Sequence, residues 1–164
     1  MRRVHSILLT SALLSVITLP AVAVADDSAT VSSATYGFRT TANDKDYDSQ
    51  TGVEIICNGH NVAQDFAHSA DRNSDHWNNN SDNGPWPLNF SDKTVTKGEL
   101  RNCAYRVSLT ANGNDEWVGN GKLSISFSDG TTWTWQFNGF DLNSRGSHTE
   151  SRTFDMTQPS GPGA

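Results

Sequence analysis

Apolar and polar residues alternate along most of the chain, and a period of two is typical of half-buried β-strands. Tyr36 and Phe38 show the alternation in one segment, and Val53, Ile55 and Cys57 show it in the next. The same pattern predicts strands at 34–40, 53–57, 61–68, 86–90, 104–110, 123–128, 131–138 and 147–156. Short strands at even spacing, separated by polar turns, favour a sandwich or barrel. We therefore expect an all-β fold, a single antiparallel β-sandwich of about eight strands.

Turn signals predict how these strands connect. The dipeptides Asn58-Gly59 and Asp129-Gly130 tolerate the type I′ geometry of tight hairpins, and Thr96 begins a capping-box sequence that predicts one helical turn. If successive strands run up and down, and the segment with the helical turn crosses without adding a strand, the two tight turns lie at one end. The long loops then lie together at the other end, at 41–52, 69–84, 111–121 and 139–146.

The first residues have the features of a secretory signal peptide. Arg2 and Arg3 give a basic start, residues 7–19 are mostly apolar, and small residues end at Ala25. We expect cleavage after Ala25 and a secreted, extracellular protein. The apolar run is short for a membrane span, so the chain is not expected to be transmembrane, although a retained N-terminal anchor helix is the alternative.

The remaining sequence divides into three parts. Residues 26–33 are small and polar and are expected to form a loose leader. Residues 34–156 form the predicted sandwich domain. Residues 157–164 are rich in proline and glycine, which predicts a disordered tail.

Charge and cysteine content limit the partners and the compartment. Loss of Arg2 and Arg3 with the signal peptide takes the net charge from −6 to −8, which argues against DNA or RNA as a partner. Cys57 and Cys103 are the two cysteines, and an even pair in an exported chain predicts one structural disulfide.

An acidic loop between the first two predicted strands is the main candidate site. Asp44, Asp46 and Asp48 alternate within it, and like charges this close repel one another unless a cation neutralises them. Dense oxygen ligands are what Ca²⁺ prefers, but the ion takes about six to eight oxygens. We therefore expect Asp115, with the carbonyl of Asn112 or Asn114, to complete a Ca²⁺ site. The alternative is a solvated, Asp-rich turn.

Two tryptophans are candidate ligand-binding residues. Trp77 lies among amides and acids in the long segment 74–86, a composition typical of a sugar-binding platform, but it could instead cover loop backbone. Trp117 follows two acids and is the better candidate for an exposed ring that touches a ligand or a membrane. Trp133 and Trp135 share one parity of their strand and are predicted to be buried.

Catalytic motifs are missing from the sequence. It contains no G-x-S-x-G, no H-E-x-x-H and no phosphate-binding glycine loop. We therefore expect a non-catalytic binding module rather than an enzyme. The alternatives are a glycan-binding module, a secreted hydrolase inhibitor and a small hydrolase that uses paired acids.

The arrangement of these features resembles a known class of module. An acid-rich loop after the first strand, with a second acidic loop between later strands, is similar to secreted β-sandwich modules of the C2 and PLAT/lipoxygenase-homology type. Short phrases at 43–46, 81–86 and 113–117 also resemble those of exported bacterial proteins. The resemblance implies calcium-dependent binding to lipid, protein or glycan through the four acids named above. The basic lipid-binding patch of many C2 domains has no counterpart here.

Overall fold

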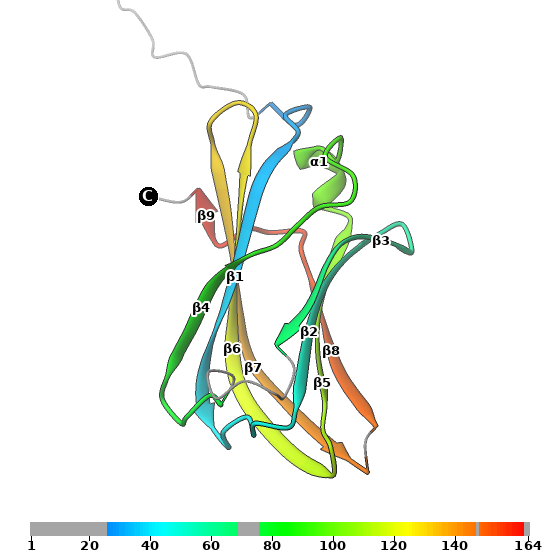
Figure 1. The fold of residues 1–164 in the computed structure, drawn as a ribbon. Helices are drawn as coiled ribbons and strands as arrows, with labels where there is room; N and C mark the ends of the chain where they lie inside the picture. Colours follow the sequence, from blue (N-terminus) through cyan, green and yellow to red (C-terminus); the bar gives the residue numbers. More distant parts are fainter. Residues whose placement is uncertain (1–25, 69–75, 147, 163–164) are drawn as a thin grey trace, which may run out of the picture.

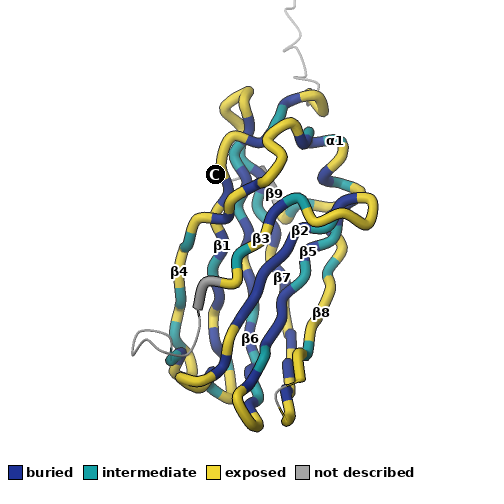
Figure 2. Tube along the Cα trace, turned by 45° about the vertical axis from the view of Figure 1, so that its right-hand side comes forward, coloured by how far each residue is buried: buried dark blue, intermediate teal, exposed yellow. Residues whose placement is uncertain are grey.

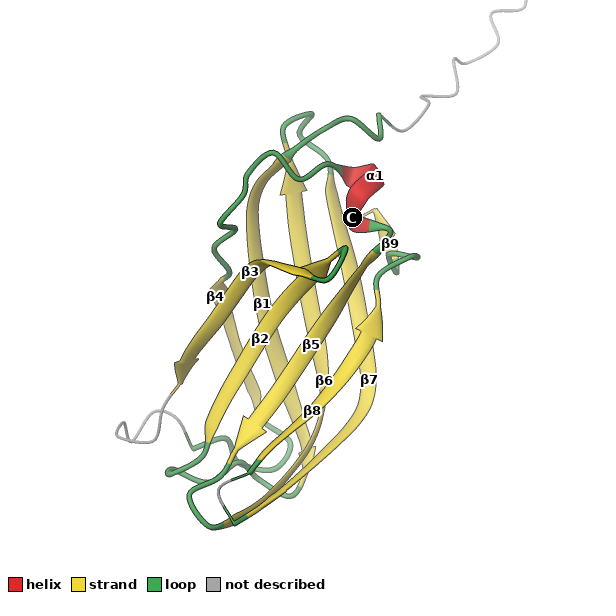
Figure 3. Ribbon diagram, turned by 90° about the vertical axis from the view of Figure 1, so that its right-hand side faces the viewer, coloured by secondary structure: helices red, strands yellow, loops and turns green. Residues whose placement is uncertain are grey.

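Two antiparallel sheets face each other in a computed structural model, which describes residues 26–68, 76–146 and 148–162. One sheet has the strand order β4-β1-β6-β7-β9 and the other has the order β3-β2-β5-β8. Figure 1 shows the two sheets side by side, and Figure 3 looks onto the four-stranded sheet. The elements are β1 (Val31–Ala42), β2 (Gln50–Cys57), β3 (His60–His68), β4 (Asp82–Pro87), α1 (Lys97–Leu100), β5 (Cys103–Thr110), β6 (Asn114–Phe127), β7 (Thr132–Arg145), β8 (Thr149–Asp155) and β9 (Gly161–Pro162). The predicted eight-stranded sandwich is confirmed, with the two-residue β9 added.

The core forms because alternate residues of each strand face the opposite sheet. Tyr36 and Phe38 of β1 are buried while Thr35 and Arg39 are exposed, and Figure 2 shows that β2 is buried along most of its length. Aromatic rings join the sheets, as where Tyr105 of β5 stacks on a phenylalanine of β7 with ring centroids 4.6 Å apart. Trp133 and Trp135 are both buried, as predicted.

The connections fall at two ends of the sandwich. The tight turns 58–59 and 128–131 lie at the upper end in Figure 1, with α1, and we call this end the turn pole. The connections 43–49, 76–81 and 111–113 lie at the lower end, which we call the loop pole. This is the arrangement that the turn signals predicted. The capping box that begins α1 is also present, with reciprocal bonds between Thr96 and its partner three residues on.

Two of the predicted long loops are mostly strand. β6 and β7 pair along almost their whole lengths, from Asn114 opposite Arg145 to Ser126 opposite Thr132. A register shift between Gly119 and Gly121 lets the pairing continue through residues that were expected to form a loop. The fourth strand was predicted at 86–90, but β4 spans Asp82–Pro87. Proline is tolerated at the edge of a sheet, where its missing N–H is not needed.

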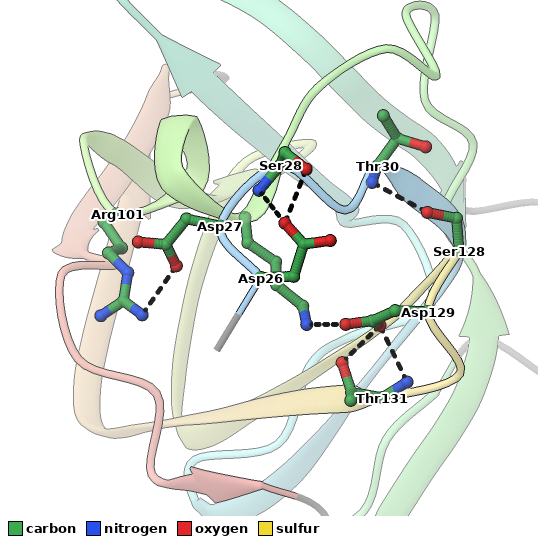
Figure 4. A network of polar contacts seen from close by, with 9 residues as sticks. Asp26, Asp27, Ser28, Thr30, Arg101, Ser128, Asp129 and Thr131 are labelled. Carbon is green, nitrogen blue, oxygen red and sulfur yellow. Dashed lines mark hydrogen bonds and ion pairs between the residues drawn. The ribbon is translucent and has the colours of Figure 1, made fainter. Parts of the chain in front are cut away.

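The expectation of a loose leader is wrong. The backbone of the leader is held by α1, because the N–H groups of Lys97 and Gly98 donate to the carbonyls of Ala29 and Asp27, both at 3.0 Å. Figure 4 shows the leader between Arg101 and the turn that contains Asp129. The first turn of a helix has free N–H groups, and the leader satisfies them here.

The expectation of a disordered tail is wrong as far as Pro162. Gly161 and Pro162 pair with Thr134 and Trp133 of β7, and Ser160 donates its N–H to the Thr134 carbonyl at 2.6 Å. The unpaired edge of β7 offers backbone groups that an extended tail can bond. The predicted signal peptide, residues 1–25, lies outside the described residues.

The predicted disulfide joins Cys57 at the end of β2 to Cys103 at the start of β5, with Cα atoms 4.3 Å apart. The two residues are direct cross-strand partners. Between them the chain adds β3 to one sheet and β4 to the other, and then returns through α1. No helix in the described part of the chain is long and apolar enough to span a membrane.

An ion pair between a buried ammonium and an exposed carboxylate anchors the turn pole. Lys97 is almost fully buried, with its Nζ 5.0 Å from the ring centroid of Phe127, and it donates to the carboxylate of Asp129. This bond, followed by those from Thr131, lowers the pKa of Asp129 from 3.8 to about 2. The pair therefore depends on Asp129 being ionised.

This pair predicts a specific sensitivity to acid. Because the pKa of Asp129 is lower in the folded chain, its stabilising effect is complete above about pH 4 and is lost as the pH falls toward 2. Asp129→Asn should lower the unfolding temperature near pH 6, since Lys97 would keep a buried charge without its partner. The gap between variant and wild type should close near pH 2. Thermal melts from about pH 6 to about pH 2 measure it, with exposed Asp141→Asn as the charge control. A gap independent of pH would contradict the assignment.

Candidate metal site at the loop pole

A backbone bridge joins two loops and positions the candidate site. The N–H of Lys45 donates to the carbonyl of Trp77 at 3.3 Å, and the N–H of Trp77 returns a bond to the carbonyl of Lys45 at 3.2 Å. Both side chains are buried, at 0% and 2% exposure, with the Lys45 ammonium 5.4 Å from the Trp77 ring centroid. Since side chains alternate along extended backbone, the flanking residues Asp44, Asp46 and His76 lie on the other side.

Those three flanking residues form a compact group of ligands. One donor atom from each of Asp44, Asp46 and His76 lies within 4.8 Å of the others. The Nε2 atom of His76 is 2.7 Å from Oδ2 of Asp44, and the ring of Tyr47 stacks on the imidazole with centroids 4.5 Å apart. The imidazole is thus held in place from two directions.

Asp115 contacts the backbone of the same loop from a different strand, and its carboxylate is not among the donor atoms of the compact group. It lies near the start of β6, is only 8% exposed, and accepts a hydrogen bond from the Asp46 N–H at 3.2 Å. A surface hollow of about 310 Å³ adjoins it, lined also by Glu116 and Arg145. Asn114 accepts a bond from the Gly146 N–H through its side-chain oxygen. The predicted role of an Asn112 or Asn114 carbonyl as a ligand stays a prediction.

The group carries excess negative charge. Burial raises the pKa of Asp46 above its ordinary 3.8, and repulsion from Asp115, Asp44 and Asp48 raises it further, with His76 partly opposing this. Four carboxylates therefore interact at the loop pole. The positive charges beside them are the ammonium of Lys45 and, when it is protonated, the imidazole of His76. The carboxylates outnumber the cations, so a bound cation would relieve the repulsion.

The structure contradicts the prediction that tryptophans contact a ligand. Trp77 and Trp117 are 2% and 0% exposed, and their rings meet edge to face with centroids 5.0 Å apart. The indole N–H of Trp117 donates to Oγ1 of Thr40 at 3.2 Å. Trp117 is buried because β6 continues through it, which gives it the inward parity of Asp115. The two rings pack in the core next to the candidate site, and neither ring has an exposed face on which a ligand could stack.

Sequence reasoning missed two members of the site. Lys45 could have been found, because if Asp44 and Asp46 share one side of an extended loop, the residue between them must face the core. His76 gave no such signal, since its position depends on which residues of two separate loops pair.

Comparison with known proteins gives no guide to the site. No protein-family model, no curated protein and no solved structure was found to match the chain. The case for a function therefore depends on the geometry described above.

Proposed function

We propose that the protein is a secreted, non-catalytic binding module whose loop pole binds a divalent cation, with Ca²⁺ the expected ion. The observation that carries this proposal is convergence. Asp44 and Asp46 come from one loop and His76 from another, with Nε2 of His76 2.7 Å from Oδ2 of Asp44, and Asp115 of β6 accepts a hydrogen bond from the Asp46 backbone N–H at 3.2 Å. A solvated turn would not need to bring carboxylates from separate elements together against their repulsion.

The same loop also contains a buried hydroxyl. The hydroxyl of Ser49 is fully buried and has no hydrogen-bond partner in the described part of the chain. A buried hydroxyl without a partner calls for a physical explanation. Ser49 is buried like Lys45, so the oxygens from which Ca²⁺ would draw its shell are the carboxylates of Asp44, Asp46, Asp48 and Asp115.

The proposed role of the ion is to order the loop pole. Bound among the carboxylates, it would fix the loop 43–49 against the segment 76–81 and present a rigid surface to a protein, glycan or lipid partner. Secretion is supported by the disulfide between Cys57 and Cys103, since such bonds persist in oxidising compartments. The absence of recognisable catalytic motifs in the sequence favours binding over catalysis.

A second candidate ion follows from His76. In the structure its ring bonds to Asp44, which suits a residue that orients a carboxylate ligand of Ca²⁺. If the ring nitrogen instead binds the metal directly, the set of two carboxylates and one imidazole suits Zn²⁺ or another transition metal.

Thermal unfolding in Ca²⁺ and in chelator tests the proposal. At about 100 times the dissociation constant, Ca²⁺ should add about 2.7 kcal/mol to the free energy of unfolding, which corresponds to several degrees. Asp44→Asn/Asp46→Asn should abolish the shift, and the double variant should melt no lower than wild type in chelator, because it removes repulsion. Asp92→Asn/Asp155→Asn changes the charge equally, away from the loop pole, and should keep the full shift. Equal shifts in both double variants, or none in wild type, would contradict the proposal.

Replacing His76 by Gln distinguishes the two ions. Glutamine can still donate a hydrogen bond to Asp44 but is a poor ligand for Zn²⁺. A Ca²⁺ site should keep most of its thermal shift in this variant. A transition-metal site should show a larger shift with Zn²⁺ than with Ca²⁺ in wild type, and should lose it in His76→Gln.

A further inference from the structure

A groove crosses the outer face of the five-stranded sheet, away from the acidic loop. It has a volume of about 470 Å³ and runs over β4, β1, β6 and β7. We call it the outer groove and define it by Gly37, Arg39, Lys122, Gln136 and Asn138. No residue of the candidate metal site lines it.

Close packing of two strand backbones forms one side of the groove. Gly37 lies between two residues whose side chains face the core, so its own position faces outward and carries no side chain. The pairing of β1 with β4 shifts register here, and a Cβ atom at Gly37 would lie 2.9 Å from the carbonyl oxygen of Asn83. The space beside Gly37 is thus filled by the backbone of β4, and glycine is needed there because it lets the two strands approach closely.

The walls of the groove carry polar side chains that have no hydrogen-bond partner in the described part of the chain. Lys122 and Gln136 are opposite each other on β6 and β7, and Asn138 follows on β7. All three are exposed, and their side chains make no hydrogen bond to any residue that the structure describes. They supply an ammonium and two carboxamides, which donate and accept hydrogen bonds.

The charge of the groove is opposite to that of the protein. Its charged side chains are Arg39, Lys122 and Asp82, and Arg39 is paired with Asp82 at 2.9 Å. Lys122 is left as the surplus charge, on a chain of net charge −6. A single carboxylate on a ligand would complement it through a charge-assisted hydrogen bond.

The aromatic residues decide between classes of ligand. Tyr36 and Phe38 flank the floor, but both rings face the core and are buried. Nucleic-acid bases gain affinity by stacking on exposed rings, and no exposed ring lines the groove in the described part of the chain. One surplus cation is also too few for the several phosphate contacts of a nucleic acid.

We propose that the outer groove binds an anionic polysaccharide, in which a uronate carboxylate pairs with Lys122 and the sugar hydroxyls bond to Gln136 and Asn138. The proposal gives the proposed binding module a partner class but does not depend on the cation at the loop pole.

Calorimetric titration with an oligogalacturonate tests the proposal. In low salt and chelator, wild type should bind the oligogalacturonate, and Lys122→Gln should weaken binding by about tenfold or more. Gln136→Ala/Asn138→Ala, which leaves the charge unchanged, should also weaken it. Lys93→Gln removes an equal charge from an exposed site outside the groove and should bind as wild type does.

The results that would overturn the proposal are separate from those that bear on the cation. Equal losses in Lys122→Gln and Lys93→Gln would show a general charge effect, and equal binding of a neutral xylan oligosaccharide or of poly-glutamate would show that the uronate is not what is recognised. Absence of any binding would also refute it. Because chelator is present throughout, failure here leaves the Ca²⁺ shift to be judged independently.

Discussion

Replacing Trp117 by Ala is expected to lower the free energy of unfolding by about 4 kcal/mol, within the range for deleting a large buried aromatic side chain. The ring is fully buried and meets Phe38, Trp77 and Phe140 edge to face with centroids 4.6–5.0 Å apart. Its indole N–H also bonds to the buried Thr40. Urea unfolding, followed by circular dichroism, measures the loss.

Trp117→Phe is the matched control for this effect. It keeps most of the ring volume but removes the N–H donor, so the loss should be about 1–3 kcal/mol. The Ala variant should also weaken Ca²⁺ binding, because Trp117 supports Trp77 beneath the metal site and shares a strand with Asp115. A loss below 1 kcal/mol for the Ala variant would contradict the packing of the loop pole.

Removing the disulfide should destabilise the fold by a similar amount. The bond between Cys57 and Cys103 has a sequence separation of 46, and closing a loop of that length is worth about 4 kcal/mol in the chain-entropy model. Cys57→Ala/Cys103→Ala should lose this amount in urea unfolding under oxidising conditions. The loop contains β3, β4 and α1, so the loss should come mainly from a less restricted unfolded chain.

Reduction provides the control for the cysteine variant. Dithiothreitol should lower the stability of wild type toward that of Cys57→Ala/Cys103→Ala and leave the variant unchanged. The Ca²⁺ shift should persist in the variant, because the disulfide lies at the turn pole, away from Asp46. A variant as stable as oxidised wild type would contradict the assigned role.

The sequence contained enough information for the fold because burial and local pattern agree in most of the strands. Tyr36 and Phe38 alternate with polar residues and face the core as expected. The pattern gave a wrong prediction where two paired strands shift register. Residues 111–121 were expected to form a loop, but a register shift between Gly119 and Gly121 lets β6 extend back to Asn114. The burial of Trp117 follows from that continuation.

The candidate site could be predicted only in part. Strand counting placed Asp115 at the same pole as Asp46, because antiparallel connections return to the same end of a sandwich. His76 was missed because the bridge between Lys45 and Trp77 is a pairing of two loops, and no periodic pattern fixes the register of loops. The sequence therefore predicted the end of the sandwich at which the site lies, and the structure showed the loop pairing that brings His76 to Asp44 and Asp46.

Calorimetric titration of Ca²⁺ into chelator-treated protein tests the central proposal most directly. We predict one saturable binding event in wild type that is strongly weakened in both Asp46→Asn and Asp115→Asn, since these carboxylates converge from a loop and from β6. Asp115→Asn keeps a side-chain oxygen that can accept the hydrogen bond from the Asp46 N–H, so this variant removes the charge and preserves the contact. Binding that is absent in wild type, or that is unchanged in Asp115→Asn, would contradict a shared cation at the loop pole.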